Sequence, residues 1–397
     1  MVARLIATAL SNLSFILIVL PILYLSEIFR PIRITHFATE RMGHLSGDIQ
    51  LFRARQAQGA NKEQFTRIIL GGFPCNQALL DIWKRYLPIN QNPWLSRYWH
   101  YNKHLLYNTR FHLPEFQTTD THREVATYTD RPTFSHEEEH RGQELLHDMG
   151  IGPDDWFITF HVRDAAYESK LYPHLTEKPL NPALRTRDGN ILDFIPAAKK
   201  IAELGGFAVR VGDITLTPLG DNQTEKIIDY SHRFRSDFGD VYLAAKCRFF
   251  LGGPSGLPQL STLFGVPVAM ANMVPVVPHP VGPRSLFWPV QVRDRKTKKI
   301  LHYREANALG MFDNAENRQW PDLKYDQEGF DIVRNSPDDI TNLALDMLDQ
   351  LNGKSPNVDA KKLQDIYRFD YANKGNGVEF APTIAPRAAL KYRHLIE

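Results

Sequence analysis

Residues 249–271 read F-F-L-G-G-P-S-G-L-P-Q-L-S-T-L-F-G-V-P-V-A-M-A. A short apolar run ends at Leu251, a turn of glycine, proline and serine follows, and a short apolar helix leads into a second strand from Val266. This order predicts a strand-turn-helix-strand unit, which is the repeating element of parallel α/β folds.

The turn of this unit is its most informative part. A helix that begins near Ser255 or Gly256 points free backbone N–H groups at whatever lies above the sheet, and glycine lets a phosphate approach the backbone closely. The same residues also fit a tight loop in which Ser255 caps the helix. The flanking sequence has to decide between the two interpretations.

The flanks continue the alternation of strands and helices. The sequence predicts strands at 32–37, 68–70, 156–162, 207–211 and 227–228, and helices at 77–86, 135–148, 194–204, 238–245 and 338–351. Asn76 is the expected N-cap of the helix at 77–86, and Ser135 with Glu138 is expected to form a capping box at the start of the helix at 135–148. This pattern predicts an α/β protein with parallel sheets covered on both faces.

Composition limits the possible functions. The chain of 397 residues has a net charge of +2 and no basic run with interleaved aromatics, so nucleic acid is not an expected partner. Cys75 and Cys247 are its only cysteines, too few for a disulfide framework. His136 and His140 match the H-E-x-x-H zinc pattern, but both lie beside a helix cap in a charged stretch typical of a solvated face. No metal site is predicted.

An apolar segment opens the chain. Residues 5–25 carry no charge and approach the length that spans a bilayer, so we interpret them as a retained membrane anchor. Arg30, Arg33 and Arg41 follow it and only Arg4 precedes it, which places the rest of the chain in the cytoplasm. A helix that lies in the membrane interface, or hooks back at Pro21, is an alternative that the sequence leaves open.

Polar residues follow the carboxyl ends of the predicted strands, where parallel α/β proteins bind ligands. The guanidinium group of arginine presents N–H donors in a fixed planar arrangement that suits the oxygens of a diphosphate. Each arginine could instead form an ion pair at the surface. The candidate nucleotide-sugar contacts are His161, Arg163, Arg210, Gly212, Arg235, Ser236, Asp237, Ser255 and Gly256. Glu40, His44 and Asp48 follow the first strand, and we rank Asp48 and His44 highest as the catalytic base.

Several motifs carry a family resemblance over residues 32–351. These are R-M-G-H-L, G-F-P-C-N-Q-A-L-L-D-I-W-K-R-Y-L, F-H-V-R-D-A-A-Y, V-R-V-G, R-S-D-F-G-D-V-Y-L-A-A and G-P-S-G-L. As a set they resemble bacterial glycosyltransferases of surface polysaccharide biosynthesis, and they are distantly similar to O-fucosyltransferase-like enzymes of GT-B architecture. The resemblance implies two Rossmann-like domains facing a cleft, inversion at the anomeric carbon, and donor contacts at His161, Arg163, Asp237, Ser255 and Gly256.

We therefore expect a membrane anchor at 1–30, an acceptor domain at 31–152, a nucleotide-sugar domain at 153–335, and a helix and tail at 336–397. The expected function is transfer of a sugar from a nucleotide-diphosphate donor to a lipid-linked or surface-glycan acceptor at the bacterial inner membrane. No D-x-D pair occurs, so neither metal nor other cofactor is expected. A non-catalytic nucleotide- or glycan-binding protein of the same fold is the alternative. A hydrolase is weaker, because Leu257 replaces the second glycine of a G-x-S-x-G elbow.

Overall fold

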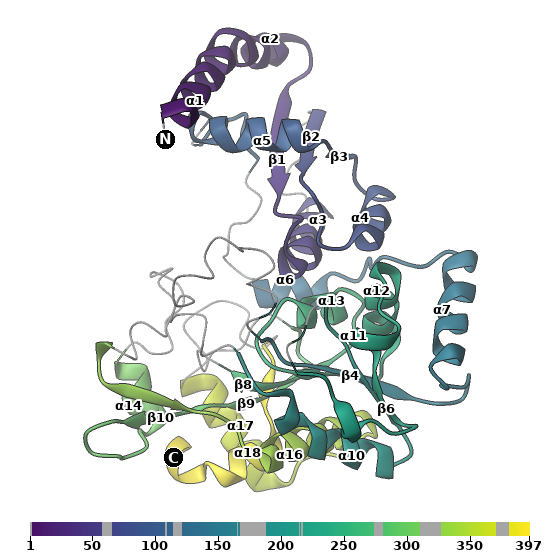
Figure 1. Cartoon of the computed structure of the whole chain (residues 1–397). Helices are drawn as coiled ribbons and strands as arrows, with labels where there is room; N and C mark the ends of the chain where they lie inside the picture. The colour runs from purple at the N-terminus through teal and green to yellow at the C-terminus, as the bar shows by residue number, and fades with distance from the viewer. Residues whose placement is uncertain are drawn as a thin grey trace. The chain divides into compact units, whose positions relative to one another are not determined.

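The computed structural model describes residues 2–57, 66–107, 109–113, 121–164, 166, 188–213, 215, 217–273, 281–309, 327–370 and 381–397. The chain divides into two compact units, Met1–Thr118 (unit 1) and Thr119–Glu397 (unit 2). Both units combine helices with parallel strands, so the predicted α/β class is confirmed (Figure 1).

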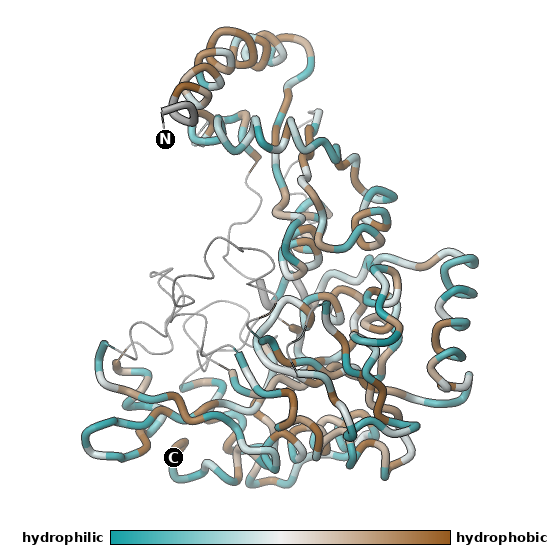
Figure 2. The backbone as a smooth tube through the Cα atoms, viewed as in Figure 1, coloured by the Kyte–Doolittle hydropathy of each residue, from teal (hydrophilic) through white to brown (hydrophobic). Residues whose placement is uncertain are grey.

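Unit 1 begins with a long apolar helix. Its parts are α1 (Val2–Ser14), a π-helical stretch (Phe15–Val19) and α2 (Leu20–Phe29). The run Ile6–Phe29 is long and apolar enough to cross a membrane by length and composition. Figure 2 shows it as a mostly hydrophobic tube. The predicted apolar helix therefore exists, and it extends a few residues beyond position 25.

A small parallel sheet forms the centre of unit 1. In the described part of the chain it has three strands in the order β1 (Ile32–Phe37), β2 (Thr66–Gly71) and β3 (Ile89–Gln91). The helices that accompany it are a π-helical stretch (His44–Asp48), α3 (Ile49–Ala57), α4 (Gln77–Lys84), α5 (Pro93–Asn102) and a 3₁₀ turn (Lys103–Leu105). Asn76 caps α4 by accepting the Leu79 N–H at 2.8 Å, as predicted.

Unit 2 is built on a larger sheet. Its described strands form a seven-stranded sheet in the order β12-β9-β8-β7-β4-β5-β6, and every neighbouring pair is parallel. The strands are β4 (Phe157–His161), β5 (Phe207–Arg210), β6 (Ile227–Asp229), β7 (Phe250–Gly252), β8 (Val268–Met273), β9 (Leu286–Pro289) and β12 (Thr383–Ile384). A separate antiparallel pair joins β10 (Gln291–Asp294) to β11 (Phe330–Val333).

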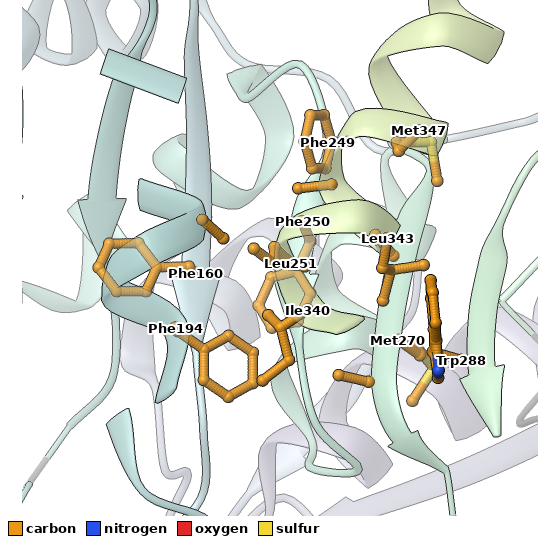
Figure 3. Close-up of a cluster of buried hydrophobic side chains, with 14 of the residues drawn as sticks. Phe160, Phe194, Phe249, Phe250, Leu251, Met270, Trp288, Ile340, Leu343 and Met347 are labelled. Atoms are coloured by element: carbon orange, nitrogen blue, oxygen red, sulfur yellow. The ribbon is translucent and has the colours of Figure 1, made fainter. Parts of the chain in front are cut away.

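Helices cover both faces of this sheet (Figure 1). The helices of unit 2 in the described residues are α6 (Thr121–Thr127), α7 (His136–Asp148), α10 (Ile195–Glu203), α11 (Tyr230–Arg233), α12 (Asp237–Lys246), α13 (Leu257–Leu263), α14 (Tyr303–Ala308), α16 (Pro337–Leu351), α17 (Val358–Asp370), α18 (Pro386–Lys391) and α19 (Arg393–Ile396), with 3₁₀ turns at Ile191–Phe194 and Gly220–Asn222. Helix α10 packs beside α16, and α12 packs beside α13. Figure 3 shows Phe160, Leu251 and Ile340 meeting in the core between sheet and helices.

The predicted division at residue 152 falls inside unit 2. Helix α7 precedes that point, yet it packs on α12: Gly142 lies against the Tyr242 ring, and Lys246 Nζ lies 2.7 Å from Glu139 Oε1. The Phe134 ring stacks on Phe264 with centroids 5.5 Å apart. Residues 336–397 also belong to unit 2, since α16 contributes core side chains and β12 extends the sheet.

Candidate functional site

The order of strands in unit 2 defines one special point of the sheet. From β4 the chain builds β5 and β6 on one side, then returns to build β7, β8 and β9 on the other. At such a reversal the loops that follow the two central strands diverge, and the opening at their carboxyl ends is where open α/β sheets bind ligands. Here the central strands are β4 and β7, whose last residues, His161 and Gly252, are paired in register.

The orientation of His161 is set by the neighbouring loop. Its Nδ1 lies 2.9 Å from the carbonyl oxygen of Val211, so Nδ1 must carry the proton and donate it. Gly212 follows with φ +145°, and a Cβ at that position would lie 3.1 Å from Nδ1. Burial lowers the pKa of His161 to about 4. The ring is therefore neutral near pH 7, and Nε2 offers a lone pair to a ligand hydroxyl.

The loop after β7 approaches His161 through backbone without side chains. A Cβ on Gly252 would lie only 2.3 Å from the His161 carbonyl oxygen, whereas a Cβ on Gly253 would meet its nearest atom at 3.7 Å. The Gly253 N–H donates to the same carbonyl at 3.3 Å. Glycine at 252 is thus required by packing, and glycine at 253 leaves the backbone open.

Ser255 contributes a buried hydroxyl without a hydrogen-bond partner among the described residues. Helix α13 has Gly256 in the N-cap position and no side-chain cap, so the interpretation of Ser255 as the helix cap was wrong. Buried hydroxyls are rarely left unbonded, so a water molecule or a ligand is the natural partner of this one.

Two of the predicted arginines form ion pairs with aspartates from other segments of the chain. Arg163, just after β4, has its Nε 3.4 Å from Asp188 Oδ1, and its side chain is only 11% exposed. Arg210 is only 2% exposed; it donates to Asp229 Oδ2 at 3.3 Å and to the Thr217 carbonyl at 2.5 Å. The geometry gives Arg210 the role of holding the loop after β5 in place, in contrast to the ligand contact expected from the sequence.

Arg235 lies within a group of acids. Its guanidinium nitrogens are 3.4 Å from Asp213, 3.4 Å from Asp237 and 3.1 Å from Asp240. Asp240 is 6% exposed, and burial raises its pKa to about 7 although Arg235 opposes the shift. Ser236 caps α12 by accepting the Gly239 N–H at 3.0 Å. The positive charge of the three predicted arginines is therefore largely neutralised by neighbouring carboxylates.

The two base candidates form a pair in unit 1. His44 Nδ1 lies 2.7 Å from Asp48 Oδ2, one turn further along the π-helical stretch. The hydrogen bond to Asp48 raises the pKa of His44 above its ordinary value. Because Nδ1 faces the carboxylate, Nε2 is the nitrogen available for proton transfer.

A second histidine pair of unit 1 was not predicted. His36, at the end of β1, lies 2.7 Å from Ser96 Oγ, and its ring meets that of His100 with centroids 4.7 Å apart. Burial lowers the pKa of His36 to about 4. Residues 36 and 96 are 60 positions apart, so no local pattern could have indicated their contact.

Comparison with known proteins gives a limited result. No family model matches the chain, and no curated protein matches its sequence. Similar solved structures include a glycosyl transferase family 9 protein from Veillonella parvula DSM 2008, with 13% identity over 81% of this chain and 98% of that one, and a TM-score of 0.45.

Two further structures are heptosyltransferases. The E. coli ADP-heptose lps heptosyltransferase II has 13% identity over 60% of this chain and 84% of that one, with a TM-score of 0.38. The iron-containing heptosyltransferase TibC, solved with ADP-D-beta-D-heptose, has 12% identity over 81% of this chain and 77% of that one, with a TM-score of 0.34. None of the three is described as a fucosyltransferase. At these values the function has to be argued from the site itself.

The structure thus sorts the predicted residues into three groups. His161, Gly212 and the loop that carries Ser255 and Gly256 adjoin the opening between β4 and β7. Arg235, Ser236 and Asp237 form the acidic group at the start of α12, and Arg210 is part of the buried framework. Asp240 and Gly252 were the site residues whose importance sequence reasoning missed, although both lie inside motifs that had been singled out.

Proposed function

We propose that this chain is a glycosyltransferase that moves a sugar from a nucleotide-diphosphate donor to a glycan or lipid-linked acceptor. The observation that carries the proposal is the carboxyl end of the paired strands β4 and β7. The neutral His161 ends β4, and the loop after β7 carries the uncovered Gly253 backbone and the unbonded Ser255 hydroxyl. A parallel sheet that reverses its strand order at this point is a common frame for nucleotides. The glycosyltransferase-like motifs indicate the reaction class.

Each donor contact has a role in this proposal. The Ser255 hydroxyl and the backbone N–H groups of the loop through Gly256 bind the diphosphate, and Arg163 adds positive charge. Nε2 of His161 accepts a hydrogen bond from a sugar hydroxyl. Asp237, whose side chain is 38% exposed, accepts hydrogen bonds from the ribose.

The remaining predicted residues position these contacts. Gly212 gives the His161 ring room to reach the Val211 carbonyl. Arg210 holds the loop after β5, while Arg235 and Ser236 fix the start of α12. Their substitution should lower the stability of unit 2 more than it changes the choice of nucleotide.

In the reaction, the bond between the anomeric carbon and the diphosphate oxygen breaks, and the electron pair leaves with the diphosphate. Donors aimed at that oxygen lower the barrier because they bind the developing charge more tightly than the ground state. The acceptor hydroxyl attacks the anomeric carbon and gives its proton to His44 Nε2, with Asp48 orienting the ring. Inversion, independence of metal ions and a place on the cytoplasmic face of the bacterial inner membrane are parts of the same proposal.

The test is a thermal-shift panel of the full chain with UDP, GDP, ADP, CMP and dTDP, with and without EDTA. One nucleotide at about 100 times its Kd should stabilise unit 2 by about 2.7 kcal/mol. The variant Ser255→Ala should lose most of that gain, and His161→Asn, whose amide can still donate to the Val211 carbonyl, should lose part of it. Ser135→Ala, far from the opening in sequence and in contacts, is the matched control and should retain the shift.

Turnover then separates transfer from binding. The matching nucleotide sugar should release nucleoside diphosphate when a glycan or lipid-linked acceptor is added. A protein that binds the nucleotide without consuming its sugar would be the non-catalytic alternative. A protein that none of the nucleotides stabilises would contradict the proposed donor site and favour a non-catalytic glycan-binding protein of the same fold.

A further inference from the structure

The N-terminal helix has its polar side chains on the inner face, where it packs on α5. Ser14 Oγ lies 2.9 Å from the Tyr98 hydroxyl, and Asn102 Nδ2 donates to Ser11 Oγ at 2.8 Å. The two contacts run in opposite directions along the helices, so α1 and α5 are antiparallel where Ser11–Ser14 meets Tyr98–Asn102. The serines that make the segment an imperfect membrane span are therefore the residues that attach it to unit 1.

The single charged residue of the segment also faces the protein. Glu27 is the only charge between Leu5 and Phe29. Its carboxylate pairs with Arg33 at 2.5 Å and with Arg110 at 3.4 Å, and its side chain is 19% exposed. The charge is thus neutralised within unit 1 and withdrawn from the outer face of the helix.

The outer face is almost entirely aliphatic. Its exposed side chains reach 65% exposure at Leu17 and 82% at Phe29. The exposed large apolar residues of the segment are Ile6, Leu10, Leu13, Ile16, Leu17, Ile18, Ile22, Tyr24, Leu25, Ile28 and Phe29. Figure 2 shows the same run as hydrophobic along its length. A helix on a water-soluble surface has the opposite arrangement, with apolar residues inward and polar residues outward.

The length of the inner contacts opposes a crossing orientation. They extend from Ser11 to Glu27, which is 27 − 11 = 16 residues and about 24 Å at 1.5 Å per residue. That is most of the roughly 30 Å thickness of a bilayer core. If the helix crossed the membrane, the parts of unit 1 that contact it would enter too. These are α5 near Ser11 and Ser14, with the exposed side chains of Arg97 and His100, and Arg110 at Glu27. Charged and irregular segments do not face lipid at that depth.

We propose that this helix lies in the plane of a lipid bilayer, with its aliphatic outer face among the acyl chains and α5 on the aqueous side. The occupant of the face is the bilayer, because the reversed polarity fits a hydrocarbon environment and no described residue covers it. Trp94, 78% exposed at the start of α5, is of the residue type enriched at membrane interfaces. The inference is independent of the transfer reaction, since a binding protein would dock in the same way.

The first test measures binding to vesicles by flotation, with neutral phosphatidylcholine alone and with added phosphatidylglycerol. The full chain should float, and the triple variant Leu10→Ser, Leu13→Ser, Leu17→Ser should bind at least ~10-fold more weakly because binding scales with inserted apolar area. The matched control replaces the same three leucines with isoleucine and should bind like the parent. Thermal unfolding of the full chain, including the transition of unit 1, verifies that all three proteins are folded.

The second test separates the in-plane helix from a crossing one. Spheroplasts of an expression host carry Ala3→Cys or Arg30→Cys in a chain that also has Cys75→Ser and Cys247→Ala, and are treated with a membrane-impermeant maleimide. An in-plane helix keeps both positions on one side, so both should react only after lysis. Reaction of Ala3→Cys in intact spheroplasts but of Arg30→Cys only after lysis would overturn the proposal. So would a lipid-free dimer that buries the outer face, or a mature chain whose mass shows that the helix has been removed.

Discussion

At the scale of single residues, Gly252 and Gly253 offer the sharpest contrast in the candidate site. A methyl group on Gly252 would lie 2.3 Å from the His161 carbonyl oxygen, a backbone atom that cannot rotate away. Gly252→Ala should therefore cost about 1–3 kcal/mol of stability by overpacking. The measurement is the melting temperature of the full chain. An unchanged melting temperature would contradict the close approach of β7 to β4.

The neighbouring substitution is its control. A methyl group on Gly253 would meet Val162 at 3.7 Å, an ordinary contact, so Gly253→Ala should change stability by less than about 0.5 kcal/mol. If the diphosphate passes along this backbone, the same variant should raise the Kd for the nucleotide by about tenfold, which is 1.4 kcal/mol. Equal effects of both variants on stability and binding would show that the loop does not act as proposed.

Asp240 should make the stability of unit 2 depend on pH. Its folded pKa of about 7 lies above the ordinary 3.8, so between these values the folded state holds a proton that the unfolded chain has released. This contribution is complete below pH 3.8 and is lost as the pH rises towards 7. Each pKa unit corresponds to about 1.4 kcal/mol, so even a shift of half this size changes stability by about 2 kcal/mol.

The measurement compares melting temperatures of the parent chain and Asp240→Asn across that range. As the pH rises from about 4 to about 7.5, the melting temperature of the parent should fall relative to that of the variant, because asparagine does not titrate. A difference that stays constant with pH would mean that Asp240 is ionised throughout.

The His44–Asp48 pair predicts how the rate of transfer depends on pH. A base must be unprotonated, so the rate should rise as the pH passes the pKa of His44, which its hydrogen bond to Asp48 raises above 6.5. Asp48→Ala should move the midpoint of the pH–rate profile downward, and Glu40→Gln should move it less, since Glu40 is the smallest contributor. A midpoint that Asp48→Ala leaves unchanged would remove His44 from the role of base.

The sequence could locate the candidate residues but not their partners. His161 and Ser255 were placed correctly at or after the ends of two strands, because the hydrophobic pattern of the sequence shows where a buried strand ends. The ion pairs of Arg210 with Asp229 and of Arg235 with Asp213 were not predicted. The partners of each pair lie in separate segments of the chain that come together only in the folded protein. Which arginine remains available to a ligand is a tertiary property.

At the scale of elements, helix α7 tests how closely the start of unit 2 is integrated. Alanine normally favours a helix over glycine by about 1 kcal/mol. At Gly142 the sign should reverse, because a Cβ would lie 2.1 Å from the Tyr242 ring and push α7 away from α12. Gly142→Ala should therefore lower the melting temperature, whereas Gln143→Ala on the exposed side should not. A stabilised Gly142→Ala would mean that α7 does not rest on α12.

The predicted elements and the missed ones differ in a physical way. Long amphipathic helices with caps, such as α4, α7 and α16, were predicted to within a few residues because caps and periodicity are local signals. Strands β3 and β12 have three and two residues and carry no readable pattern. The order β12-β9-β8-β7-β4-β5-β6 was also out of reach, since it depends on which way each crossover turns.

At the scale of the whole molecule, the division between the units is the main difference from expectation. Gly150, with φ +77°, and Pro153 form a strong turn signal, which indicated a boundary near 152. A turn inside a domain gives the same local signal as a linker between domains. Only packing distinguishes them, and α7 together with Phe134 packs on helices that follow the turn.

This difference yields a prediction about fragments. The segment Thr119–Glu397 has its own core and sheet and should fold alone. It should also retain the nucleotide-dependent thermal shift of the full chain, because the opening between β4 and β7 lies within it. The fragment 153–397 lacks α7 and Phe134, so Tyr242 and Phe264 lose their cover, and it should melt lower or aggregate.

Circular dichroism melts and nucleotide titrations of the two fragments and the full chain provide the measurement. If 153–397 is as stable as Thr119–Glu397, the boundary lies at the turn after α7 and the contacts of α7 are incidental. If Thr119–Glu397 folds but loses the nucleotide shift, unit 1 supplies part of the donor site, and the contacts proposed for His161 and Ser255 are insufficient. Retention of the full shift would assign donor binding to unit 2 alone, as the contacts proposed for His161 and Ser255 require.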